Sequence, residues 1–194
     1  MSCKAARLIC IGLLVLGLAQ MAQGSWIHLK AALAQLLLEK AWQRSLQTGQ
    51  ASKPWSWADT WPLARLEIPR LGVDLIVLAG DHGQALAFGP GHASLSAKPG
   101  EPGTMLISGH RDTHFRFLKD LQAGDLIRIG GAAGIEYEYR VTTTEVVDST
   151  KTRVISDPNQ HRLILATCWP LDAVIPGGNQ RYLVISGSEQ GPTS

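Results

Sequence analysis

The chain has 194 residues, which leaves room for one folded domain and a terminal extension. Its formal net charge is only +2 and no long block of lysines and arginines occurs, so nothing indicates nucleic-acid binding. The 20 glycines and 10 prolines fall mostly after Lys53, between short apolar runs. This distribution favours many short strands joined by turns.

Residues 1–27 are interpreted as a cytoplasmic N-terminus followed by an uncleaved membrane anchor. Lys4 and Arg7 precede an uncharged, mostly apolar stretch from Leu8 to Ile27, and a spanning helix needs about 20 such residues. A cleavable signal peptide is the alternative, because Ala22-Gln23-Gly24 fits a small-x-small cleavage site. Under either interpretation the folded part of the chain is exported.

Residues 28–62 are predicted to form a juxtamembrane helix and a tryptophan-rich linker. From His28 to Gln47 leucines recur at helical spacing, and no glycine or proline interrupts the pattern. Trp55, Trp57 and Trp61 follow at close spacing. We expect them to pack on the domain as an N-terminal strap, with contact to a membrane surface as the alternative.

The folded domain is predicted to span residues 63–188, with a C-terminal tail at 189–194. Apolar runs predict strands at 64–68, 73–78, 104–109, 125–129, 135–147, 162–167 and 182–187. Short helical pieces are expected at 84–88 and 114–121. Strands at this spacing, with little helix between them, indicate an all-β barrel or sandwich.

Cys168 is the only cysteine beyond the N-terminal segment, and it ends the apolar run 163–167. In an oxidising compartment cysteines usually occur as disulfide pairs, and this one has no exported partner. A solitary exported thiol is a liability unless its reactivity is used, so Cys168 is the candidate nucleophile. The contrary interpretation is an inert buried thiol.

A nucleophilic thiol needs a base or a positive partner, because only the thiolate is competent. His110 directly follows the strand predicted at 104–109, as Cys168 follows the strand at 162–167, and groups at the same ends of neighbouring strands can face one cleft. His114 is a competing candidate for the base. Arg181 opens the last strand, and pairing of that strand with the cysteine strand would let its guanidinium stabilise an oxyanion.

These residues resemble the motifs of the sortase family. Ile164-Leu165-Ala166-Thr167-Cys168 is similar to the sortase motif Thr-Leu-x-Thr-Cys, with Ile164 in place of its first threonine. Gly109-His110-Arg111 resembles the sortase histidine region, and Arg181 lies where the sortase arginine would. The stretches 88–92 and 107–115 are similar to sortases of Gram-negative, marine proteobacterial type, called class GN. The resemblance covers about residues 63–188 and implies a closed β-barrel of about eight strands with short helices.

The resemblance implies a membrane-anchored cysteine transpeptidase, a cysteine endopeptidase by class, in the inner membrane with its catalytic domain in the periplasm. Cys168 would attack the Thr–Gly carbonyl of a Leu-Pro-x-Thr-Gly-like C-terminal sorting signal on a secreted protein, and the thioacyl group would pass to an amine acceptor. His110 would protonate the leaving amine and deprotonate the incoming one. Arg181 would hold the substrate carbonyl or oxyanion, and Thr167 would orient the substrate through its hydroxyl or backbone.

Two more residues are candidates for substrate binding. His92 is expected at the lip of the substrate groove, with a turn histidine as the alternative. Asp112 is expected either to support the site or to pair with Arg111 in the loop. The histidines and acids show no metal-ligand spacing, so we expect neither metal nor cofactor.

Three other functions remain open from the sequence. An L,D-transpeptidase is another exported β-rich cysteine enzyme, but its cysteine motif carries an arginine two residues on, where this chain has Trp169-Pro170. A simple thiol protease would use water as the acceptor. A non-catalytic periplasmic binding module would keep the barrel and leave the thiol unreactive.

Overall fold

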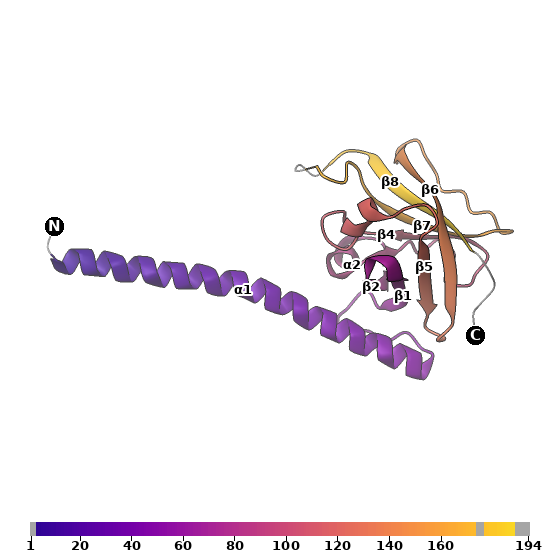
Figure 1. Cartoon of the computed structure of the whole chain (residues 1–194). Coiled ribbons are helices and arrows are strands. Elements are labelled where there is room, and N and C mark those ends of the chain that lie inside the picture. The colour runs from indigo at the N-terminus through magenta and orange to yellow at the C-terminus, as the bar shows by residue number, and fades with distance from the viewer. Residues whose placement is uncertain (1–2, 174–176, 189–194) are drawn as a thin grey trace. The chain divides into compact units, whose positions relative to one another are not determined.

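The computed structural model describes residues 3–173 and 177–188 (Figure 1). The predicted tail at 189–194 lies outside the described residues. The elements in chain order are α1 (Cys3–Thr48), β1 (Pro62–Ile68), η1 (Pro69–Leu71), β2 (Val73–Ala79), α2 (Gly83–Phe88), β3 (Gly91–His92), β4 (Gly103–Ser108), η2 (Arg116–Asp120), β5 (Leu126–Gly131), β6 (Glu136–Asp148), β7 (His161–Cys168) and β8 (Gln180–Ser188).

A single helix, α1, occupies the two segments that the sequence analysis divides at residue 27. The helix continues through residue 27, since no proline occurs before residue 54 to break the helical hydrogen bonding. Among the described residues, no helix combines the length and the hydropathy needed to cross a bilayer, so the structure gives the predicted transmembrane helix no support. The chain forms two compact units, residues 1–37 and residues 38–194.

Eight strands close into one barrel in the order β1-β2-β3-β4-β7-β8-β6-β5 (Figure 1). This confirms the prediction of an all-β barrel of about eight strands with short helices. The β2–β3 and β4–β7 pairs are parallel, and the other pairs are antiparallel. Strand β3 was not predicted, because a two-residue strand is too short to show a period of two.

The barrel interior is filled by apolar side chains from nearly every strand. In β1 every second residue is buried, so the strand turns one face to the core and the other outward. The 3₁₀ segment η2 closes the core with Leu118, and Phe115 just before it is fully buried. The main cluster also includes Leu66, Ile68, Met105, Ile107, Ile127, Ile129, Leu163, Leu165 and Val184.

The last turns of α1 belong to the same compact unit as the barrel. Leu38 and Trp42 are buried, and Leu38 packs with Leu78 of β2 and with Ala85 of α2. After the helix, Trp55 contacts Phe88 edge to face with ring centroids 5.1 Å apart. Part of the tryptophan-rich linker thus packs on the domain, whereas Trp57 is 81% exposed.

Candidate active site

The parallel β4–β7 pair carries two candidate residues to the same edge of the barrel. Its last matched residues are Ser108 and Ala166. Beyond them the Gly109 N–H donates to the Ala166 carbonyl at 3.1 Å, and the buried Thr167 hydroxyl donates to the Gly109 carbonyl at 2.7 Å. His110 and Cys168 therefore leave the two strands side by side.

The β7–β8 pair adds the arginine to this edge. Cys168 and Arg181 are directly matched in the antiparallel register, so the thiol and the guanidinium start from neighbouring backbone positions. One nitrogen of the guanidinium, Nη1, donates to the Gly178 carbonyl at 3.0 Å and to the Gln180 carbonyl at 2.9 Å. These two bonds hold the arginine at the rim of the site.

Cys168, His110 and Arg181 line one cleft of about 370 Å³. His110 is exposed and Cys168 partly exposed, so a substrate can reach both. The cleft walls are mostly apolar and come from α2, β4, the β6–β7 segment, β7 and β8. Its other lining residues are Asp81, Leu86, Leu106, Ser108, Gly109, Val147, Ser149, Thr152, Val154, Ala166, Thr167 and Leu183.

Gly109 sets the turn from which His110 projects. A Cβ at this position would lie 2.7 Å from Cγ of the Phe115 ring, far closer than side-chain carbons pack, so the turn requires glycine. The Phe115 N–H also donates to the His110 carbonyl at 3.0 Å. Since the Phe115 ring is fully buried in the core, the position of His110 is tied to the packing of the barrel.

Arg111 ties the segment after β4 to the loop after β7. Its guanidinium is 3% exposed; Nη1 donates to the Pro170 carbonyl at 2.8 Å and Nη2 donates to the Ala173 carbonyl at 3.0 Å. Nε lies 3.3 Å from Oδ1 of Asp112, which confirms the predicted ion pair in the loop. The residue next to His110 therefore holds the loop that follows Cys168, a contact that the sequence alone does not indicate.

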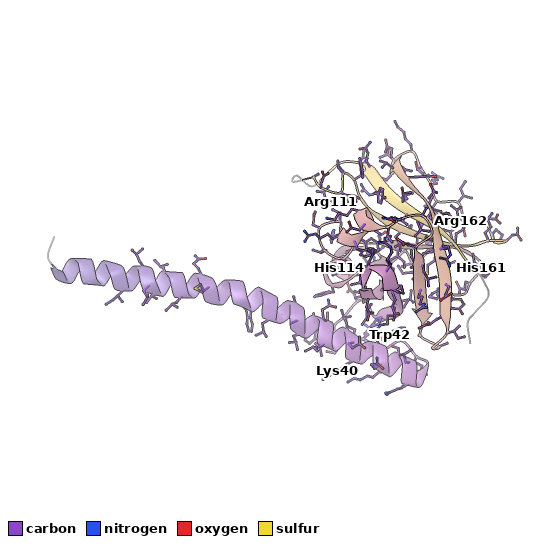
Figure 2. All side chains as sticks on the ribbon, in the orientation of Figure 1. Lys40, Trp42, Arg111, His114, His161 and Arg162 are labelled. Atoms are coloured by element: carbon purple, nitrogen blue, oxygen red, sulfur yellow. The ribbon has the colours of Figure 1, made fainter. Side chains whose placement is uncertain are left out.

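His114 lies beside this segment, and Figure 2 labels it together with Arg111. Partial burial lowers the pKa of His114, the positive charge of a protonated His110 lowers it further, and a hydrogen bond with the Ala87 backbone opposes both. His114 is not among the residues that line the cleft. The arrangement favours His110 over its competitor as the acid–base group.

The three predicted substrate-binding residues occupy different places. Thr167 lines the cleft, but its hydroxyl is used in the bond to Gly109 rather than left for substrate. His92 is buried on β3, where Nε2 lies 2.9 Å from the Ala97 carbonyl and 3.0 Å from the Ser96 hydroxyl, outside the cleft lining. Asp112 lines a neighbouring hollow together with residues of the β7–β8 loop. The structure thus brings only Thr167 of the three to the thiol.

The motif order and the barrel match one family. A family model described as the sortase domain matches residues 66–188, which is more than half of the chain. The chain belongs to the sortase family. Within the described residues, no group of histidines, cysteines and acids is arranged to hold a metal ion.

Individual relatives agree with this assignment. Sortase D of Bacillus subtilis is 36% identical over 141 residues, which are 71% of this chain and 64% of that protein's length. Sortase A from Corynebacterium diphtheriae is 26% identical, with a TM-score of 0.61 over 82% of this chain and 85% of that one. A Clostridium perfringens sortase D5 transpeptidase shares the fold, with a TM-score of 0.66 at 22% identity over 82% of this chain and 99% of that one.

We predict that Arg111→Gln lowers both stability and turnover. The substitution removes the two hydrogen bonds that the buried, charged Arg111 side chain donates to the Pro170 and Ala173 carbonyls, and a hydrogen bond to a charged group contributes about 1.5–3 kcal/mol. Thermal unfolding and peptide cleavage measure the two effects. Arg116→Gln, which changes an exposed arginine nearby, is the matched control and is expected to alter neither. Equal behaviour of the two variants would remove Arg111 from this role.

We predict that His114 makes the fold less stable in mild acid. Its pKa in the folded protein lies below the unfolded value of about 6.5, so the unfolded chain binds more protons there. Its contribution is fully present above the unfolded pKa and is lost as pH falls toward the folded pKa. Urea unfolding between pH 5 and 8 should show a shallower pH dependence for His114→Gln than for His161→Gln, which changes an exposed histidine. Identical slopes would contradict the prediction.

Proposed function

We propose that this sortase is a cysteine transpeptidase that cleaves a C-terminal sorting signal of a secreted protein and transfers the acyl group to an amine. The observation that carries the proposal is the convergence of Cys168, His110 and Arg181 on one cleft. A thiol, an imidazole and a guanidinium supply a nucleophile, an acid–base group and an oxyanion donor.

The proposed reaction runs through two acyl transfers. The Cys168 thiolate attacks the peptide carbonyl, and Arg181 donates hydrogen bonds to the oxyanion that forms. The imidazolium of His110 gives its proton to the leaving amine as the C–N bond breaks, which leaves a thioester on Cys168. The incoming amine attacks this thioester and loses a proton to His110, and the C–S bond breaks to restore the thiolate.

The donor we propose is a signal of the Leu-Pro-x-Thr-Gly type. The apolar walls formed by Leu86, Leu106 and Leu183 suit apolar side chains of such a signal, and the thiol that must reach the Thr–Gly carbonyl lines the same cleft. Assignment to the Gram-negative class GN rests on the stretches 88–92 and 107–115. Because the chain belongs to the sortase family, we do not propose an L,D-transpeptidase activity for it. Hydrolysis in place of transfer would make the protein a thiol protease.

Cys168→Ala should abolish cleavage of a sorting-signal peptide, because Cys168 is the one cysteine among the described residues that line the cleft. Arg181→Lys should lower kcat by roughly 10²–10³, since a point charge does not reproduce the guanidinium fork. Arg162→Lys is the matched control at the opposite end of β7 and should keep wild-type turnover. Peptide cleavage with and without an added amine, followed by mass spectrometry, measures both hydrolysis and transfer.

Three results would count against the proposal. Cleavage by Cys168→Ala would remove the nucleophile, and normal turnover in Arg181→Lys would remove the arginine from the mechanism. A Cys168 that resists alkylation in the native protein would favour the non-catalytic binding module.

We also propose that the N-terminal part of α1 anchors the protein in the inner membrane, with the barrel in the periplasm. The stretch 8–27 carries no charge, and Leu14 and Leu16 are 64% and 61% exposed on the helix. An arginine in the middle of a spanning helix costs about 2.5–3.5 kcal/mol for insertion.

Leu14→Arg should therefore move the full-length chain from the carbonate-resistant membrane fraction to the soluble fraction. Leu33→Arg, at a 54% exposed position beyond the apolar stretch, should not. Carbonate extraction of wild-type chain from membranes would contradict the anchor.

A further inference from the structure

A single acid stands in the wall of the cleft. Asp81 follows β2 in the connection to α2 and is half-buried at the cleft. Among the described lining residues it is the one carboxylate, and most of the others are apolar or carry only a hydroxyl. An acid in this wall is not needed by the two acyl transfers, which use Cys168, His110 and Arg181.

Among the described residues, the Asp81 carboxylate has one hydrogen-bond partner, and that bond is weak. Its Oδ2 accepts a hydrogen bond from the Ser108 hydroxyl at 3.5 Å, the long limit for such a contact. A carboxylate that is partly buried beside apolar side chains loses hydration, and a hydrogen bond from a positively charged donor stabilises it. A cationic side chain of a substrate would therefore be stabilised at this wall by a charge-assisted hydrogen bond to Asp81.

The position of Asp81 is fixed by backbone packing. A Cβ on Gly91 of β3 would lie 2.2 Å from the Gly80 carbonyl oxygen and 2.8 Å from the Asp81 Cα, so the two segments are in direct contact. The neighbouring Ala79 N–H donates to the Trp61 carbonyl at 2.9 Å. Because the connection is pressed against β3, Asp81 is held in place before any substrate arrives, and a preorganised group discriminates better than a mobile one.

We propose that Asp81 is a specificity determinant that selects a sorting signal with a lysine or arginine side chain. The aliphatic stem of such a side chain fits along Leu86 and Leu106, and its charged end reaches the carboxylate. This departs from an all-apolar Leu-Pro-x-Thr-Gly signal at one position. The inference rests on the proposed function, since it names the donor of that reaction.

The alternative role for Asp81 is electrostatic support of His110. A series of substituted substrate peptides distinguishes this role from the selection of a cationic side chain. In the experiment, each of Leu, Pro and x in a Leu-Pro-x-Thr-Gly peptide is replaced in turn by Lys, norleucine or Glu. The wild-type enzyme should prefer Lys over norleucine at one position by about tenfold in kcat/KM, the size expected for one charge-assisted hydrogen bond. Asp81→Asn should remove that preference and leave the norleucine peptide nearly unchanged.

Glu145→Gln is the matched control, because it removes one charge from an exposed residue of β6 that does not line the cleft. It should keep the wild-type preference. The specificity role is overturned if no position prefers Lys, or if Asp81→Asn lowers turnover of the Lys and norleucine peptides equally. Thermal unfolding midpoints establish that both variants are folded.

A second measurement does not depend on turnover. Cys168 is modified with a cationic and an anionic methanethiosulfonate of equal size, and the ratio of the two rates reports the charge of the cleft. Asp81→Asn should lower the cationic-to-anionic ratio several-fold, and Glu145→Gln should leave it unchanged. If no peptide is cleaved, the proposed function fails while this ratio still decides whether Asp81 attracts cations. An unchanged ratio in Asp81→Asn would overturn the inference even in an active enzyme.

Discussion

The parallel pairing of β4 with β7 is the constraint on which the site depends. Strands that run parallel end at the same edge, so the residues that follow them emerge together. An antiparallel pairing of the same segments would put His110 and Cys168 about 20 Å apart, at roughly 3.3 Å for each residue of the ladder. The Thr167–Gly109 hydrogen bond then fixes both chains just beyond the last ladder pair.

Next to the β4–β7 pair, the barrel supplies a charged residue from β8 and apolar residues that line the cleft. β8 runs antiparallel to β7 and therefore begins beside the end of β7, which places Arg181 next to Cys168. Apolar residues of α2, β4 and β8 line the same cleft. The thiol, the imidazole and the guanidinium thus lie at strand ends, while most of the wall is apolar and Asp81 is its one carboxylate among the described residues.

The sequence was sufficient for features that depend on periodicity and on strand order. Apolar runs located β1, β6 and β8 within a few residues, and the position of His110 and Cys168 after two buried strands indicated that the two residues meet. Features that depend on packing between distant loops were not predictable. Nothing local to Asp81 indicates that it enters the cleft, and nothing local to Arg111 indicates bonds to carbonyls about sixty residues away. The continuity of α1 through residue 27 was not predicted, because the composition changes there although no proline interrupts the helix.

The bonds from Arg111 to the loop after Cys168 have a consequence for exchanging parts between related enzymes. If the β7–β8 loop were replaced by the loop of another sortase, the new loop would have its own spacing of carbonyl groups. Arg111 belongs to a different segment of the chain and would not be exchanged with it. The graft would then fit only if its carbonyls met the two nitrogens of this guanidinium. The loop and the arginine would therefore have to be exchanged together, although β5, β6 and β7 separate them in the sequence.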